Sequence, residues 1–148
     1  MSTPNPYAPP RSNVDAVPRE IVDIDSLDVS DTWKKRFKAM QKAGGPSLPN
    51  VKELSPEDRK AITGFNVIAF FLGPIYYIAK GMWKKAITIF VLGFIALLII
   101  DVILAAVGWS AASNATGIGF AVVWASLANA DYYRKMVLGQ NGWWWGKG

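Results

Sequence analysis

The sequence contains no cysteine and no histidine. A chain without cysteine has no disulfide framework and no thiolate nucleophile, and a chain without histidine lacks the side chain that most often serves as general base or metal ligand. These absences exclude most familiar designs of hydrolytic, redox and metal sites. We therefore expect a protein that is not an enzyme, with no catalytic residues, no bound metal and no cofactor.

Charged residues are scarce in the second half of the chain, although the net charge is +5 and 51% of all residues are hydrophobic. Between residues 62 and 133 the charged residues are Lys80, Lys84, Lys85, Asp101 and Asp131. The lysines flank apolar segments and no nucleic-acid fold signature accompanies them, so they suit anionic lipid headgroups. The expected partner is a lipid bilayer with anionic headgroups, and nucleic acid is not expected.

Residues 1–29 are expected to form a disordered cytoplasmic tail that is first rich in proline and then acidic. The opening MSTPNPYAPPRSN lacks the basic start, apolar centre and cleavage site of a signal peptide, so insertion would use the internal apolar segments. Proline fixes φ and removes an amide donor, which favours an extended chain. The tail is either a solvated segment or a docking peptide, although no complete recognition motif is present.

Residues 30–61 are predicted to form cytoplasmic amphipathic helices. Trp33 and Phe37 lie four residues apart among several lysines, which places both aromatic rings on one helix face. This helix suits a headgroup surface, with Trp33 and Phe37 as interface anchors, and it equally suits packing on another part of the protein. A second helix is expected to begin at Pro56, because Ser55 is a good N-cap residue.

Residues 62–138 carry the predicted membrane domain. The run over residues 86–107 is long and apolar enough to span a hydrocarbon core of about 30 Å. The segment over residues 117–133 is shorter and is predicted to form a second transmembrane helix, because a tyrosine pair and two basic residues follow its apolar part. The intervening turn carries no charge.

Residues 62–79 contain Gly73-Pro74 near their middle, so this apolar segment either crosses the membrane as a kinked helix or turns back. Short cytoplasmic loops hold the positive charge of membrane proteins. If the segment turns back, all the flanking basic residues lie on the cytoplasmic face: Arg59, Lys60, Lys80, Lys84, Lys85, Arg134 and Lys135. We therefore favour a re-entrant segment, with Gly73 and Pro74 at its turn.

Asp101 lies within the longest apolar run, where a carboxylate is costly and is a functional hypothesis by default. It is expected to accept hydrogen bonds from Trp124, Asn66 or Ser126 as a packing or oligomer contact. Alternatively, its pKa is raised and it relays protons along a polar path with Asn66 and the break at Gly73-Pro74.

Gly117, Ala121, Ala125 and Asn129 recur every four residues along the second predicted transmembrane helix. Such a stripe of small residues allows close approach of another helix, and Asn129 would add a hydrogen bond across the contact. The approaching helix is either that of residues 86–107 or a helix of a second copy of the chain.

The last ten residues, 139–148, form a tryptophan-rich tail. Trp143, Trp144 and Trp145 stand beside a lysine, and large amphipathic rings next to a cation are typical of a membrane-interface anchor. Trp83, which precedes the longest apolar run, is expected to serve as a further anchor. Stacking of the rings on a ligand is the alternative.

The stretch FNVIAFFLGPIYYIAKGMWKKA at residues 65–86, together with WKKRFKAMQKAGGPSLP at residues 33–49, resembles a bacterial family of small membrane proteins catalogued as domain of unknown function 2628. The resemblance covers roughly residues 30–135 and leaves out the proline-rich start and the NGWWWGKG end. It implies an inner-membrane protein without an established biochemical activity, and it assigns no catalytic residue.

These observations predict an all-α, multi-pass protein of the bacterial inner membrane with both termini cytoplasmic. Its elements would be a cytoplasmic amphipathic helix, a re-entrant or kinked hydrophobic hairpin and two transmembrane helices. The expected function is that of a non-enzymatic scaffold or accessory subunit at the cytoplasmic face, with a second copy or another membrane protein as partner. The alternative is a small transport or channel component that uses Asp101.

Overall fold

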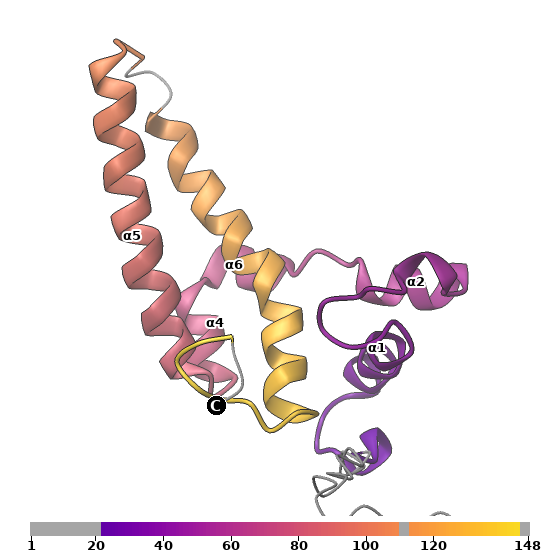
Figure 1. Ribbon diagram of the computed structural model, residues 1–148. Coiled ribbons are helices and arrows are strands. Elements are labelled where there is room, and N and C mark those ends of the chain that lie inside the picture. Colours follow the sequence, from indigo (N-terminus) through magenta and orange to yellow (C-terminus); the bar gives the residue numbers. More distant parts are fainter. Residues whose placement is uncertain (1–21, 110–112, 146–148) are drawn as a thin grey trace, which may run out of the picture.

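The computed structural model describes residues 22–109 and 113–145, and all regular structure within these ranges is helical (Figure 1). The elements are η1 (Ile24–Ser26), α1 (Asp31–Lys42), η2 (Val51–Glu53), α2 (Pro56–Ile62), α3 (Val67–Leu72), α4 (Pro74–Ala79), α5 (Trp83–Ala106) and α6 (Ser113–Met136). The all-α prediction is therefore confirmed for the described ranges. Most of the predicted 1–29 tail, and residues 146–148 of the tryptophan-rich tail, lie outside them.

Two long helices and a lateral lobe make up the architecture. Helices α5 and α6 form an antiparallel hairpin whose far end carries the turn between them, and α3 and α4 pack on the lower parts of these two helices (Figure 1). Helices α1 and α2 pack on each other beside α6 and form the lobe. We call the end of the hairpin nearest α4 its base and the opposite end its tip.

The lobe follows its local sequence signals. Helix α2 begins at Pro56, and the Ser55 hydroxyl accepts the Asp58 N–H at 3.2 Å, as a capping residue does. Helix α1 ends at Lys42, and Gly44 follows with a φ of 89°, which glycine adopts without strain. The predicted start of the second helix at Pro56 is thus confirmed.

The aromatic stripe of α1 faces the protein. Phe37 is fully buried, and its ring contacts those of Tyr132 and Tyr133 at the base of α6. Trp33 is half-buried, with its ring centroid 4.7 Å from that of Tyr132. Phe37 is therefore not an interface anchor. The alternative interpretation, packing on another part of the chain, describes this helix, because the stripe meets a matching aromatic surface on α6.

The segment over residues 62–79 is broken at Gly73. Helix α3 ends at Leu72, α4 begins at Pro74, and Gly73 between them has φ 42° and ψ −113°. Each helix has six residues and so extends only about 9 Å, far short of a hydrocarbon core of about 30 Å. Gly73 is buried against the ring of Trp124, where a Cβ would lie 3.4 Å from the nearest ring atom.

Helix α5 is, within the described ranges, the one helix long and apolar enough to cross a membrane. Its 24 residues extend roughly 36 Å at about 1.5 Å per residue. Only 11% of its most apolar stretch is buried inside the structure, so the described part of the chain does not cover this helix as a core helix. Helix α6 is equally long but more polar, and it begins four residues before the predicted position at 117.

The contact between the two long helices depends on a glycine of α5. A Cβ at Gly93 would overlap the ring of Phe120, so this glycine accommodates the ring at the helix interface. The small-residue stripe of α6 lies elsewhere: Gly117 is exposed with open space around it, and Ala121 is half-buried. Ala125 lines a pocket with Phe65, beside the segment that precedes α3.

Replacing Gly73 with alanine is expected to destabilise the fold. The substitution forces an L-residue into a positive-φ conformation, which costs roughly 1–3 kcal/mol. Thermal unfolding of the full chain in detergent, followed by circular dichroism, measures the loss. Gly117→Ala is the matched control and should leave the midpoint unchanged or slightly higher, because that position is helical and open. Equal midpoints for the two variants would show that the turn at Gly73 is not strained by a side chain.

Candidate functional site

Four polar side chains meet where α1, α3, α4 and α6 converge, and we call Arg36, Asn66, Tyr76 and Asn129 the asparagine cluster. The Asn66 amide nitrogen donates to the Tyr76 hydroxyl oxygen at 3.1 Å and to Asn129 Oδ1 at 3.0 Å. Asn66 Oδ1 accepts the Ala69 N–H at 2.9 Å and thereby caps α3. Both asparagines are 8% exposed, so these bonds compensate their removal from water.

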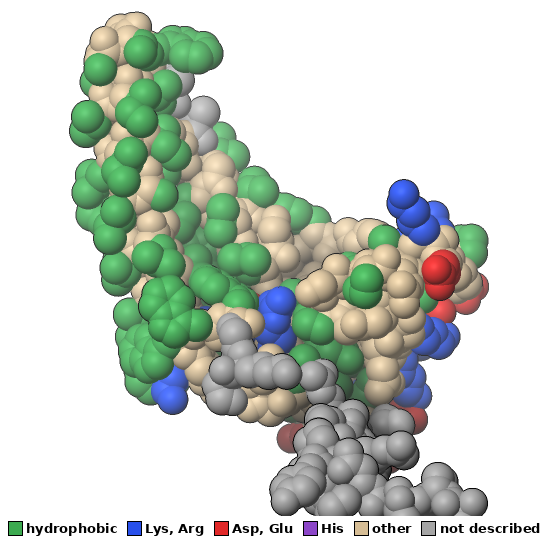
Figure 2. All heavy atoms as spheres, viewed as in Figure 1, with side chains coloured by type: hydrophobic (Ala, Val, Ile, Leu, Met, Phe, Trp, Pro, Cys, Tyr) green, Lys and Arg blue, Asp and Glu red, His purple; other side chains and the backbone are tan. Residues whose placement is uncertain are grey.

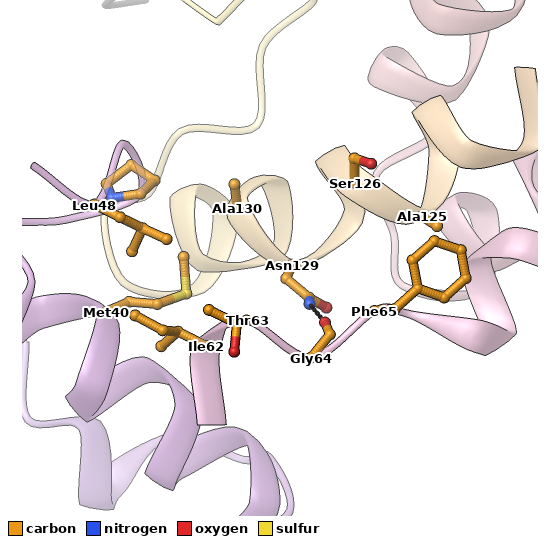
Figure 3. Close-up of a pocket in the computed structure, with 11 residues that line it drawn as sticks. Met40, Leu48, Ile62, Thr63, Gly64, Phe65, Ala125, Ser126, Asn129 and Ala130 are labelled. Atoms are coloured by element: carbon orange, nitrogen blue, oxygen red, sulfur yellow. Dashed lines mark hydrogen bonds between the residues drawn. The ribbon is translucent and has the colours of Figure 1, made fainter. Parts of the chain in front are cut away.

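Asn129 connects the cluster to the lobe. Its amide nitrogen donates to the Gly64 carbonyl at 2.9 Å (Figure 3), while its Oδ1 also accepts from Arg36 Nη1 at 3.3 Å. Arg36 Nε donates in turn to the Ala61 carbonyl at the end of α2, at 2.9 Å. Burial lowers the pKa of the Arg36 guanidinium from its ordinary value. The cluster therefore fixes α1 and α2 against α6 with hydrogen bonds as well as apolar packing.

Two pockets flank the segment that joins α2 to α3, and Phe65 lines both. The first has a volume of about 230 Å³ and lies between Met40 of α1 and the Ala125–Asn129 face of α6 (Figure 3). The second has a volume of about 270 Å³ and lies between α1, α3 and α4, with Arg36 and Lys80 in its lining. The two pockets differ in charge, because the lining of the first includes no charged side chain.

A second buried group of polar residues, which we call the ionic cluster, surrounds Asp131 at the base of the hairpin. Asp131 Oδ1 accepts from Lys85 Nζ at 3.2 Å, from Arg134 Nη1 at 3.1 Å and from Trp145 Nε1 at 2.8 Å. Asp131 Oδ2 accepts the Tyr77 hydroxyl at 3.1 Å. The side chains of Asp131 and Lys85 are 0% and 1% exposed, so these hydrogen bonds take the place of the water that both groups lose on folding.

The charges of the ionic cluster do not balance, because one carboxylate lies between two cations. Such a cluster can hold elements together. A catalytic site would also need a nucleophile and a base that face a cavity. Within the described ranges, no group of three or more His, Cys, Asp or Glu side chains is arranged to hold a metal ion.

Asp101 lies far along α5, towards the tip, and is half-buried. The Thr116 hydroxyl donates to Asp101 Oδ1 at 3.5 Å, the outer limit of a hydrogen bond. The three expected partners are engaged elsewhere: Asn66 belongs to the asparagine cluster, the Ser126 hydroxyl donates to the Val122 carbonyl at 2.7 Å, and Trp124 packs on Tyr77. Asp101 and Asn66 are thus in different environments.

The tryptophans near the base divide into two kinds. Trp83 and Trp143 are 48% and 43% exposed, and their ring centroids lie 5.5 Å apart in an edge-to-face contact. Trp144 is 65% exposed. These three have the exposure that interface anchors need. Trp145 does not, because it is half-buried and its indole N–H donates to the buried Asp131.

Sequence reasoning missed the ionic cluster. It grouped Lys85 with the basic residues of a cytoplasmic loop and assigned no role to Asp131 or Tyr77. One signal was available: Lys85 and Asp131 are opposite charges, each at the base end of one of the two long apolar segments. An antiparallel hairpin brings such ends together, so the pair could have been proposed from the positions alone.

Replacing Asp131 with asparagine is expected to destabilise the protein by about 3–5 kcal/mol, because Lys85 and Arg134 lose a buried counter-charge. The unfolding midpoint in detergent measures the loss. Asp101→Asn, the matched control on the neighbouring helix, should change the midpoint much less, because Asp101 is half-buried and its contact with Thr116 is long. A larger effect at Asp101 than at Asp131 would contradict this ranking of the two carboxylates.

Comparison with known proteins identifies relatives but no activity. The family model described as protein of unknown function, DUF2628, matches residues 27–137. The uncharacterized protein YigF of Salmonella typhimurium is 33% identical over 128 residues, which cover 81% of this chain and 94% of that protein. YigF of Escherichia coli K12 is 33% identical over 133 residues, which cover 84% of this chain and 97% of that protein. No solved structure matches the chain. The chain belongs to the DUF2628 family of proteins of unknown function.

Proposed function

We propose that this chain is a non-enzymatic integral protein of the bacterial inner membrane, in which the α5–α6 hairpin spans the bilayer and the α1–α2 lobe serves as a scaffold on the cytoplasmic face. The single observation that carries the proposal is the apolar surface of α5. Its large hydrophobic side chains are exposed around the helix: Ile87, Phe90, Val91, Leu92, Phe94, Ile95, Leu98, Ile99, Ile100, Val102 and Ile103. Soluble monomeric proteins rarely expose so extensive an apolar surface, and such surfaces mark contacts with a membrane or with another protein.

The distribution of charge supports this placement. Hydrophobic side chains cover the visible face of the hairpin above its base, and charged side chains gather over the lobe and the base (Figure 2). The turn at the tip carries no charged residue, whereas Lys84, Arg134 and Lys135 lie at the base. The rule that positive charge stays in the cytoplasm then orients the base and the lobe inward. Helix η1, near the start of the described chain, packs on α1 of the lobe, and Trp145, near its end, donates to Asp131 at the base. Both termini would therefore be cytoplasmic.

Helices α3 and α4 would enter the membrane only partly. Their outward side chains are apolar and exposed, among them Ile68, Phe71, Leu72, Ile75 and Ile78. The broken backbone at Gly73 packs on Trp124 of α6, which is the protein environment that irregular backbone requires at membrane depth. A re-entrant pair of short helices against the hairpin satisfies both observations.

The scaffold role rests on how firmly the lobe is held. Arg36, Asn66 and Asn129 bond α1, the end of α2 and the start of α3 to α6, so the lobe keeps one orientation relative to the hairpin. A second copy or another membrane protein would dock on that lobe or on the exposed hairpin. The relatives are proteins of Salmonella typhimurium and Escherichia coli, which supports the bacterial part of the proposal.

A small transport component is the second candidate, and Asp101 is the observation that favours it. A half-buried carboxylate beside Thr116, between two helices that would cross the bilayer, is costly without a function. The scaffold is preferred because Asp101 lies far from Asn66 and from the broken helix that a polar path would join.

Single-cysteine labelling tests the topology, and the absence of native cysteine removes any background. In spheroplasts, a membrane-impermeant maleimide should label Trp109→Cys at the tip. It should label Ser55→Cys, Lys80→Cys and Trp144→Cys only after the membrane is permeabilised.

Each contrary result identifies the part of the topology that is wrong. Labelling of Ser55→Cys and Lys80→Cys from opposite faces would show that residues 62–79 cross the membrane. Extraction of the whole chain by alkaline carbonate would refute the proposed membrane insertion.

Asp101→Asn separates the two candidate functions. If the chain is a scaffold, liposomes containing the variant should show the same proton permeability as liposomes containing the original chain, measured with a pH-sensitive dye under an imposed potential. A proton flux that requires the original chain and falls at least about tenfold in Asp101→Asn would establish transport instead, because removing an essential relay typically costs this much or more.

A further inference from the structure

The larger pocket, of about 270 Å³, has a cationic side and an apolar side. Trp33 and Arg36 of α1 and Lys80, just after α4, form the cationic side. Val67 and Ile68 of α3 form the apolar side. The volume is slightly below the range of about 300–1,000 Å³ typical of pockets that enclose whole small molecules. It therefore suits one polar group of a larger amphipathic ligand.

Neither cation of this pocket, Arg36 or Lys80, forms an ion pair with another described residue. The cations that form ion pairs within the described ranges are Lys38, Lys42, Lys85 and Arg134. Instead, aromatic rings hold the two cations. The Lys80 ammonium lies 4.6 Å from the ring centroid of Tyr132 and 5.6 Å from that of Trp33, and the Arg36 guanidinium lies 4.8 Å from the Trp33 centroid. Ring faces attract a cation without neutralising it, so both positive charges remain available to an anion.

Hydrogen-bond donors accompany the two charges. Of the five N–H donors of a guanidinium, Arg36 uses one on Nε and one on Nη1 for bonds to Ala61 and Asn129. The Tyr76 hydroxyl accepts from Asn66 and still has its own proton to donate. Free donors on a planar guanidinium beside an ammonium and a hydroxyl form the arrangement that recognises the oxygens of a phosphate group.

The apolar side distinguishes a lipid phosphate from a free phosphate ion. Val67 and Ile68 are 56% and 59% exposed, and the exposed surface continues along α3 and α4 through Phe71, Leu72 and Ile75. Inorganic phosphate gains nothing from such a surface. Acyl chains, in contrast, gain free energy with each methylene that such a surface removes from water.

We propose that this pocket binds the headgroup phosphate of an anionic phospholipid, with Arg36, Lys80 and Tyr76 on the phosphate and the acyl chains along the outer side of α3 and α4. The inference rests on the proposed membrane insertion, since it places the pocket at the level of the cytoplasmic headgroups. Lys80 lies three residues before α5 begins, at the end of the hairpin where the apolar surface stops.

Native mass spectrometry of the full chain tests the proposal. The protein in neutral detergent micelles is titrated with phosphatidylglycerol or phosphatidylcholine, with and without inorganic phosphate. It is then released from the micelles in the mass spectrometer, where the lipid-bound fraction is measured. A neutral micelle has no surface potential, so the bound fraction reports local contacts. We expect phosphatidylglycerol to bind more tightly than phosphatidylcholine, and inorganic phosphate to compete weakly.

Lys80→Gln should weaken phosphatidylglycerol binding about fivefold, the effect expected for one cation near an anionic lipid. Lys80→Arg should retain binding. Lys84→Gln is the matched control, since it removes the same charge from a lysine at the same end of α5 that does not line the pocket. Ile68→Asn, at an exposed position, should weaken the binding of phosphatidylglycerol and leave the affinity for inorganic phosphate unchanged.

Three results would overturn the proposal. They are equal affinity for the two lipids, equal losses of phosphatidylglycerol binding in Lys80→Gln and Lys84→Gln, or an affinity for inorganic phosphate as high as that for phosphatidylglycerol. The comparison of lipids on the original chain needs no variant, so a poorly folded variant does not remove the test. Membrane insertion is judged separately by carbonate extraction. A chain that stays in the membrane but does not prefer the anionic lipid refutes this pocket and leaves the proposed topology intact.

Discussion

The fold depends on one buried carboxylate. Asp131 of α6 accepts hydrogen bonds from Tyr77 of α4, Lys85 of α5 and Trp145 of the C-terminal segment, so three separate parts of the chain converge on it. A charge removed from water is stable only when its partners are positioned in advance, which makes the convergence a condition of folding. The helix ends are fixed at the base, whereas the upper half of α5 contributes mostly apolar surface.

The asparagine cluster fixes the lobe to the hairpin. Asn129 lies two residues before Asp131, so a single turn of α6 faces the ionic cluster on one side and the lobe on the other. Its bonds to Gly64, Asn66 and Arg36 use the hydrogen-bonding capacity that a buried amide must satisfy. The same turn thus holds the base of the hairpin together and fixes the orientation of the lobe. The larger pocket forms where the lobe meets α3 and α4.

Local signals in the sequence predicted the helices better than they predicted the contacts. The Ser55 cap, the break at Gly73 and the apolar run of α5 are properties of neighbouring residues, and each was correctly located. For Phe37 the sequence left two interpretations open, a membrane-surface anchor and a contact within the protein, because an amphipathic face looks the same whether it meets lipid or protein. The structure buries this ring completely. The bond between Asn66 and Asn129 spans 63 positions, and no local pattern reports such a pairing.

Two lysines at the base show how the burial of a cation is linked to its ion pairing. Lys85 points into the protein, is 1% exposed and has a carboxylate partner, as a cation removed from water requires. Lys80 lies only five positions earlier but is held by the faces of Tyr132 and Trp33, with no carboxylate partner among the described residues. A cation retained in that state gains most from an anion outside the chain. At the bilayer edge that we propose for this pocket, the abundant anion would be the lipid phosphate, and α3 would supply the apolar surface next to it.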